Sequence, residues 1–132
     1  MIINAEKDGA AYATEKDKRI TKFGRFLRKS RFDEIPQFLN VIKGNMSVIG
    51  PRPERPVFVK ELSEKIPFYE IRHIVKPGVT GWAQVNAKYG STEDDALEKL
   101  QYDLYYIKHR SLFLDITIVF KTLSTIIFFR GQ

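Results

Sequence analysis

The spacing of apolar residues along the chain predicts a mostly helical domain with a few short strands. Apolar side chains recur every three or four residues, the period of an amphipathic helix, in several separate segments. We expect helices over residues 19–31, 33–43, 56–66 and 92–109, and an apolar helical segment over residues 112–129. Alternating residues predict short strands at 46–50 and 82–86. The predicted fold class is therefore α+β, in one compact domain.

Residues with restricted or permissive backbone geometry mark where these elements begin and end. Pro36 suits the first turn of its helix, which starts at residue 33 or 35, and Gly44 provides a stop. Ser91 or Thr92, followed three residues later by an aspartate, resembles a capping box. Residues 76–81 have the glycine and proline content of a turn. The polar segment 6–18 predicts a solvated loop or a frayed helix.

Composition narrows the chemistry that the chain can perform. Its 132 residues suit a single domain, and the 43% that are hydrophobic suffice for a packed core. The absence of cysteine excludes disulfides, thiol nucleophiles and cysteine-ligated metals, so any metal should be a hard ion bound by oxygen. His73 and His109 are isolated and are expected at a surface or an interface. The first residues carry no secretory signal, which favours a cytoplasmic setting.

A net charge of +6 indicates an anionic partner, which could be a phosphate compound, a nucleic acid or an acidic membrane surface. Residues 19–31 contain six Lys or Arg and no acid, with Phe23, Phe26 and Leu27 at helical spacing. This segment is a predicted basic amphipathic helix. Asp33 and Glu34 follow it directly. Helix dipole and nearby cations favour their ionised forms, which suits a nucleophile or a Mg²⁺ ligand, although ordinary helix capping explains the same spacing.

Two loops and one helical acid are further candidates. Arg52 stands between two prolines, so a stiff loop could aim its guanidinium at a phosphate; a surface salt bridge is the alternative. Residues 76–82 resemble a ligand loop without being a P-loop, and the alternative is a tight turn with Trp82 in the core. Asp103 lies among bulky apolar residues, where it is either a buried functional carboxylate or solvent-facing, which the helical period slightly favours.

The segment 112–129 is the most apolar part of the chain but is interrupted by Asp115 and Lys121. Three interpretations stay open: a helix in the protein core, an interfacial helix lying on a membrane, and, least favoured, a membrane-spanning helix.

Three blocks, in order, resemble the signature of the bacterial sugar transferases, the polyprenyl-phosphate hexose-1-phosphate transferases. They are residues 28–53, which include Asp33-Glu34 and Gly50-Pro51-Arg52-Pro53, residues 76–86 and residues 100–108. The resemblance covers nearly the whole chain and implies a catalytic domain over residues 1–132 with amphipathic helices at the membrane surface.

The resemblance also implies a reaction and a site. Asp33 would attack the β-phosphoryl group of a UDP-hexose, release UMP and carry the sugar phosphate until polyprenyl phosphate accepts it. Glu34 would help to hold Mg²⁺, Arg52 and Arg28 would bind phosphate, and Asp103 would be a further active-site acid. The setting would be the cytoplasmic face of the bacterial inner membrane, at the first membrane step of exopolysaccharide or O-antigen assembly. Candidate elements of sugar specificity are Tyr69, Arg72, His73 and residues 87–91.

The chain departs from the family pattern because no long apolar N-terminal helix precedes these blocks. We therefore expect the catalytic C-terminal part of such a transferase, truncated at its N-terminus. An inactive remnant, or an interaction subunit of a split transferase, is the alternative. Nucleic-acid binding is disfavoured, because the basic cluster adjoins a carboxylate pair and no nucleic-acid motif is present.

Overall fold

The computed structural model describes residues 20–29, 35–88, 90 and 92–127. The elements in chain order are α1 (Lys22–Lys29), α2 (Ile35–Ile42), β1 (Ser47–Ile49), α3 (Pro56–Lys65), the 3₁₀ helix η2 (Tyr69–Ile74), β2 (Gly78–Thr80), α4 (Trp82–Asn86), α5 (Glu93–Lys108) and α6 (Leu112–Ile127). The prediction of a mostly helical α+β domain is confirmed. The predictions for residues 6–18 lie outside the described residues.

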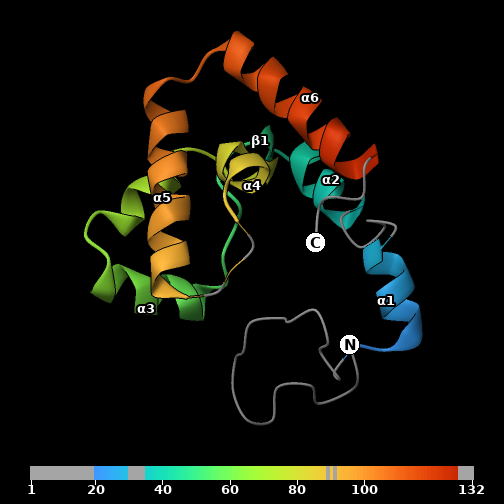
Figure 1. Ribbon diagram of the computed structural model, residues 1–132, viewed down its shortest axis with the longest axis horizontal. Coiled ribbons are helices and arrows are strands. Elements are labelled where there is room, and N and C mark those ends of the chain that lie inside the picture. The colour runs from blue at the N-terminus through green and yellow to red at the C-terminus, as the bar shows by residue number, and fades with distance from the viewer. Residues whose placement is uncertain (1–19, 30–34, 89, 91, 128–132) are drawn as a thin grey trace.

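Two long helices frame the molecule. In Figure 1, α5 stands upright with α3 at its lower end, and α6 leaves the upper end of α5 and runs towards the side on which α1 and α2 lie. The short helix α4 contacts both α5 and α6, and the strands lie behind it. Helix α4 is therefore held in place by both α5 and α6.

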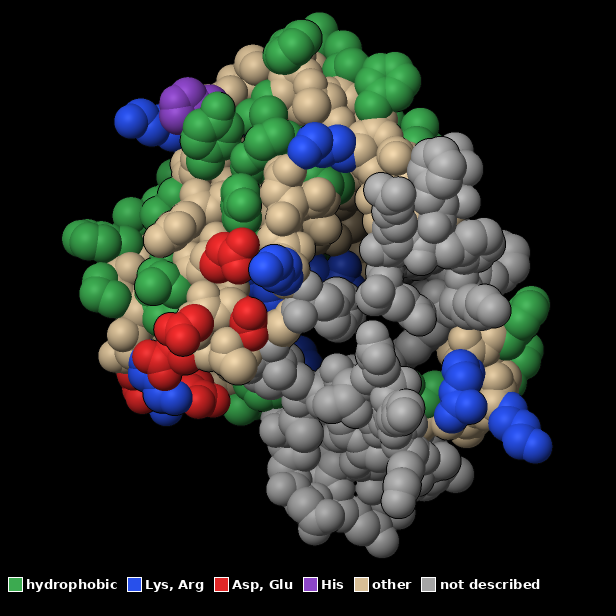
Figure 2. Space-filling view, in the orientation of Figure 1, with side chains coloured by type: hydrophobic (Ala, Val, Ile, Leu, Met, Phe, Trp, Pro, Cys, Tyr) green, Lys and Arg blue, Asp and Glu red, His purple; other side chains and the backbone are tan. Residues whose placement is uncertain are grey.

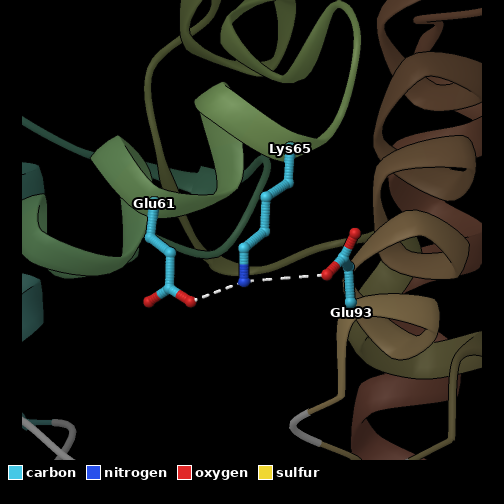
Figure 3. A network of polar contacts seen from close by, with 3 residues as sticks. All are labelled: Glu61, Lys65 and Glu93. Atoms are coloured by element: carbon cyan, nitrogen blue, oxygen red, sulfur yellow. Dashed lines mark hydrogen bonds and ion pairs between the residues drawn. The ribbon is translucent and has the colours of Figure 1, made fainter.

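The core lies where α3, η2 and the first half of α5 meet. Leu62, Ile66, Tyr69 and Leu100 form its buried cluster, and Leu104 packs against it. At the surface of the same junction, Lys65 Nζ lies 2.9 Å from Glu61 Oε1 and 3.7 Å from Glu93 Oε2, which links α3 to the start of α5 (Figure 3). All three side chains are about half exposed, so this network adds little to stability beyond what the apolar cluster provides.

The sheet has two parallel strands, in which Ser47 pairs with Gly78 and Ile49 pairs with Thr80. The pairing continues past β1, because the Gly50 amide donates to the Thr80 carbonyl at 2.9 Å and the Gly78 amide donates to the Pro51 carbonyl at 2.9 Å. A Cβ on Gly78 would come within 2.1 Å of the Gly50 nitrogen. Glycine is required here because the two backbones touch.

The expected strand over residues 82–86 is wrong, because these residues form helix α4. The second strand is Gly78–Thr80 instead, inside the segment that the sequence predicts as a turn. Five alternating residues carry little periodic information, and the tertiary pairing with β1 decides which residues extend. The Asn86 side chain then donates to the Trp82 carbonyl at 2.8 Å, across the single turn of α4.

Several predicted boundaries are confirmed. Gly44 follows α2 with a φ of 78°, the left-handed conformation of a helix stop. Thr92 caps α5 through a capping box with Asp95, and Pro56 stands in the first turn of α3. The helix predicted to end near His109 ends at Lys108. The basic helix begins at Lys22, because Ile20 and Thr21 are not helical, and residues 30 and 31 of the predicted helix lie outside the described residues.

Helix α6 is not a core helix, although its sequence is the most apolar of the chain. Ile118 is its one fully buried side chain among the residues whose exposure is described, whereas Phe113 is 82% and Phe120 is 68% exposed. Its inward face is partly polar, since Thr122 and Thr80 share a hydrogen bond of 2.7 Å. Within the described parts of the chain, no helix meets the length and hydropathy needed to cross a membrane.

We predict that Gly78→Ala lowers the free energy of unfolding by about 1–3 kcal/mol, because the new methyl group would overlap the Gly50 backbone. Urea unfolding followed by circular dichroism measures the loss. Gly24→Ala is the matched control: Gly24 lies within α1, where alanine is favoured by up to about 1 kcal/mol, so no loss is expected. Equal stability of the Gly78→Ala variant and the wild type would contradict the close strand approach.

Candidate active site

The carboxylate pair on which the sequence prediction depends, Asp33 and Glu34, lies outside the described residues, and so does the side chain of Arg28. The described chain resumes at Ile35, the first residue of α2. Among the described residues, the candidate site consists of Arg52, Asp103 and the side chains that contact them.

Arg52 follows β1 directly after the buried residues Gly50 and Pro51. The strand pairing fixes its starting point, because the Pro51 carbonyl accepts a hydrogen bond from the Gly78 amide. The guanidinium reaches α4, where its Nη1 donates to Gln84 Oε1 at 3.0 Å. An exposed guanidinium on a short, doubly fixed loop suits the predicted role of a phosphate-binding group.

The backbone of Arg52 has a second anchor, which comes from Arg72 in η2. Arg72 is 5% exposed, and its Nη2 donates to the Arg52 carbonyl at 2.9 Å. Its Nη1 donates to the Tyr69 hydroxyl at 2.6 Å. The sequence marks Arg72 only as a possible element of sugar specificity, whereas the structure directs its guanidinium to partners inside the protein.

Asp103 is the acidic partner of this arginine. It is 1% exposed, and its Oδ2 lies 2.9 Å from Arg72 Nη2. The contact is an ion pair without the alignment of a good hydrogen bond. Burial raises the pKa of Asp103 to about 6, although Arg72 favours the charged form. The pair is thus ionised at neutral pH in surroundings that disfavour the charge.

The solvent-facing orientation that the helical period favours for Asp103 is wrong. Asp103 shares the buried stripe of α5 with Leu100 and Tyr106, while the apolar residues Leu97 and Tyr105 are 42% and 47% exposed. The helical period predicts the wrong orientation because two apolar side chains of α5 point towards solvent and one acidic side chain points into the protein. Whether Asp103 acts in the reaction, as the resemblance implies, stays a prediction.

Aromatic contacts hold α4, which carries Gln84. The Trp82 ring stacks on Tyr105 of α5 at 6.1 Å between centroids, and Lys121 Nζ of α6 lies 5.0 Å from the centre of the Trp82 ring. Lys121 also donates to Asn86 Oδ1 at 2.5 Å. Trp82 is therefore half-buried between three helices and is not a fully buried core residue, and the ligand-loop interpretation of residues 76–82 stays a prediction. His73 and His109 are exposed, as predicted.

A pocket among the described residues lies away from these contacts. It has a volume of about 350 Å³ and is lined by α2 and β1 residues together with Lys76 and Arg110. It shares no lining residue with the group formed by Arg52, Gln84, Arg72 and Asp103. The candidate site therefore rests on the contacts of Arg52 and not on cavity size.

Comparison with known proteins identifies the family. Residues 1–129 match the sequence model of a family described as "Bacterial sugar transferase". The chain belongs to the bacterial sugar transferase family. The resemblance noted from the three sequence blocks is confirmed.

Relatives of this sugar transferase chain carry specific names. It is 53% identical over 127 residues to a UDP-N-acetylgalactosamine-undecaprenyl-phosphate N-acetylgalactosaminephosphotransferase of Aeromonas hydrophila, covering 96% of this chain and 30% of that protein. It is 48% identical to a UDP-glucose:undecaprenyl-phosphate glucose-1-phosphate transferase of Escherichia coli K12, covering 83% and 24%. A protein of the same name from Caulobacter vibrioides is 39% identical, with 95% and 48% covered. The chain thus spans less than half the length of these relatives.

Gln84 is the site residue that the sequence prediction misses in this sugar transferase. Its sequence signal is weak: it is a polar residue within the second block that resembles the family, residues 76–86. Its approach to Arg52 spans 32 residues of sequence and depends on the parallel strand pairing, which no local pattern specifies.

We predict that the free energy of unfolding depends on pH because of Asp103. The folded-state pKa of about 6 lies above the usual 3.8, so the stability contribution of Asp103 is fully present below about pH 4 and is lost as the pH rises through 6. This increase in the pKa of Asp103 corresponds to a change of about 3 kcal/mol in the free energy of unfolding. The free energy of unfolding should therefore fall by about this amount between pH 4 and pH 7 relative to Asp103→Asn, measured by urea unfolding.

The Asp103→Asn variant is also its own control for the other acids. Asp95, whose pKa is lowered by its hydrogen bonds with Thr92, titrates equally in both proteins and cancels in the difference. A difference in stability that stays constant across this pH range would show that Asp103 has an ordinary pKa.

Proposed function

We propose that this chain transfers a sugar 1-phosphate from a UDP-sugar to undecaprenyl phosphate. The names of its relatives support the class of reaction. The structural observation that carries the proposal is Arg52, an arginine whose carbonyl and guanidinium are each held by a separate element. Transfer of a phosphoryl group depends mainly on positioned cations that neutralise its oxygens, and a fixed arginine meets that need.

The proposed reaction has two steps at Asp33. Its carboxylate attacks the β-phosphorus of the UDP-sugar, and the bond from that phosphorus to the bridging oxygen breaks, so UMP leaves with the bonding electrons. A phosphate oxygen of undecaprenyl phosphate then attacks the same phosphorus and releases the Asp33 carboxylate. A covalent intermediate divides one difficult displacement into two easier ones. Arg52 and Arg28 would bind the phosphate oxygens during both steps.

Mg²⁺ is the metal that the donor set fits. The described residues contain no group of three side chains able to hold a metal ion, and Asp103 is committed to an ion pair with Arg72. The proposed ligand is Glu34, beside Asp33, whose carboxylate oxygens suit a hard cation. When bound, Mg²⁺ would reduce the negative charge of the diphosphate.

The proposed setting is the cytoplasmic face of the inner membrane, with α6 lying on the lipid surface. Residues Phe113, Ile116, Phe120 and Leu123 form an exposed apolar face of α6, and Figure 2 shows hydrophobic side chains along the upper edge of the molecule, where α6 lies. Acidic side chains gather at the lower left, at the end where α3 and the start of α5 lie. An apolar face remote from the acidic end suits an anionic bilayer.

Helices α1 and α2 extend the apolar surface. Phe23 of α1 is 69% exposed and Ile42 of α2 is 82% exposed, and α2 has no buried residue. Lys22 and Arg25 of α1 would contact lipid phosphates. Contact with lipid would remove these large apolar side chains from water.

We predict that the chain, with Mg²⁺ and undecaprenyl phosphate in detergent micelles, releases UMP from UDP-N-acetylgalactosamine or UDP-glucose. Asp33→Asn should lower the rate by at least about 1,000-fold, because it removes the nucleophile. Arg52→Met should raise KM or lower kcat by about 10- to 100-fold, the value of a hydrogen bond to a charged group. Lys60→Met, which removes an exposed cation of α3, is the matched control and should have no effect.

Two outcomes would contradict this proposal. Release that survives Asp33→Asn would overturn the nucleophile, and no release from either sugar nucleotide would favour an inactive remnant or an interaction subunit. Chromatographic detection of UMP gives both results from the same reactions.

We predict that the chain co-sediments with vesicles that contain anionic phospholipid. Replacing Phe120 of α6, which is 68% exposed, by aspartate should weaken binding about 10-fold or more, since the ring would lose its burial in lipid. Val57→Asp places the same charge at an apolar position of α3 that is 58% exposed, so it is the matched control. Equal weakening by the α3 and α6 variants would overturn the assignment of α6 as the membrane face.

A further inference from the structure

We infer that Arg72 and Asp103 are positioning residues, which fix the backbone of Arg52 for phosphate binding, and that Asp103 acts on the reaction only through Arg72. The inference rests on the proposed function, because it concerns the arginine that would bind the substrate phosphates. It assigns Asp103 a role different from the active-site acid that the family resemblance implies.

Burial separates Asp103 from any substrate. The residue is 1% exposed, and it faces Arg72 from inside the stripe of α5 that also contains Leu100 and Tyr106. A carboxylate in this position cannot touch a nucleotide sugar or a lipid phosphate without unfolding of its surroundings. Its effect on ligands must therefore pass through another side chain.

Arg72 is the side chain through which Asp103 can affect Arg52. One nitrogen, Nη2, lies 2.9 Å from Asp103 Oδ2 and 2.9 Å from the Arg52 carbonyl oxygen. The other terminal nitrogen donates to the Tyr69 hydroxyl, which fixes the plane of the guanidinium. Asp103 and Tyr69 thus orient Arg72, and the oriented donor then holds the Arg52 backbone.

The contacts that hold the Arg52 loop come from three other elements. Pro51 and Pro53 have no amide hydrogen, and residues 52–55 belong to no helix or strand. The Gly78 amide holds the loop before Arg52, Arg72 holds it at Arg52, and Gln84 holds the guanidinium. Three contacts from three elements restrict the arginine before any ligand arrives, which reduces the entropy lost on binding.

Stability alone does not account for the buried pair. Apolar side chains of similar size commonly stabilise a protein as well as a buried ion pair does, because two charges need not lose their hydration. Burial raises the pKa of Asp103 well above its usual value even though Arg72 lies beside it, and Glu54 adds a further negative charge nearby. Ionisation of Asp103 therefore lowers the stability of the fold at neutral pH, while the pair supplies a directed donor that an apolar pair lacks.

The decisive variant replaces both charges together. Arg72→Met combined with Asp103→Leu should unfold at the same urea concentration as the wild type or a higher one, yet raise KM for the UDP-sugar or lower kcat by about 10-fold or more, because the Arg52 carbonyl loses its donor. Lys65→Met, which removes the exposed ion pairs of this α3 residue with Glu61 and Glu93, is the control and should keep full activity. A stable double variant with wild-type kinetics would overturn the inference.

A cycle with Arg52 separates an indirect from a direct role. If Asp103 acts through Arg52, then Asp103→Asn should have little further effect on KM and kcat in a chain that already carries Arg52→Met. Effects that multiply in the combined variant would show that Asp103 acts on the substrate by another route and would overturn the inference. Arg72→Lys, which keeps the charge but offers one nitrogen, should reproduce the defect even if the apolar variant fails to fold.

A readout without turnover keeps this inference separate from the proposed function. In ¹⁵N-labelled protein, relaxation of the Arg52 Nε–H group reports how strongly the side chain is fixed. We expect a rigid Arg52 in the wild type and in Lys65→Met, and a more mobile Arg52 in Arg72→Lys. Unchanged Arg52 relaxation in Arg72→Lys would overturn the inference, whereas absence of UMP release from the wild type would overturn the proposed function alone.

Discussion

Gly50 and Gly78 bring the backbones of β1 and β2 so close that a Cβ on Gly78 would lie 2.1 Å from the Gly50 nitrogen. This approach sets the position of the residues on either side. Arg52 follows one strand by three residues, and α4, which carries Gln84, follows the other. The parallel pairing therefore brings the Arg52 guanidinium to Gln84, and a side chain on either glycine would separate them.

The molecule buries charged side chains and exposes apolar helix faces, the reverse of the usual distribution. The interior contains an arginine and an aspartate that belong to the candidate site, whereas α6 packs inward partly through Thr122 and presents phenylalanines outward. Such an arrangement is unfavourable for a chain surrounded by water on every side. It is reasonable for a protein that sets a phosphate-binding arginine beside a lipid surface, which is the function proposed above.

Local chemistry made much of the fold predictable. Gly44, Pro56 and the Thr92 capping box end or begin helices through contacts within four residues, so sequence spacing is enough to locate them. The predictions fail where the conformation of a segment depends on contacts with residues distant in the sequence. Residues 82–86 alternate like a strand, yet β2 forms just before them, because Gly78–Thr80 pairs with β1 and both Gly78 and Gly81 allow the backbone to approach Gly50 closely.

The sequence by itself determined the family, the helical character, several helix boundaries and the candidate arginine, because each follows from local spacing or from blocks of matching residues. The tertiary structure decided which way Asp103 points and what Arg72 holds. Both depend on η2 packing against α5, a contact between segments 31 residues apart that no periodic pattern contains. It also decided that α6 turns its apolar face outward, because the direction of a helical face depends on where the rest of the chain packs.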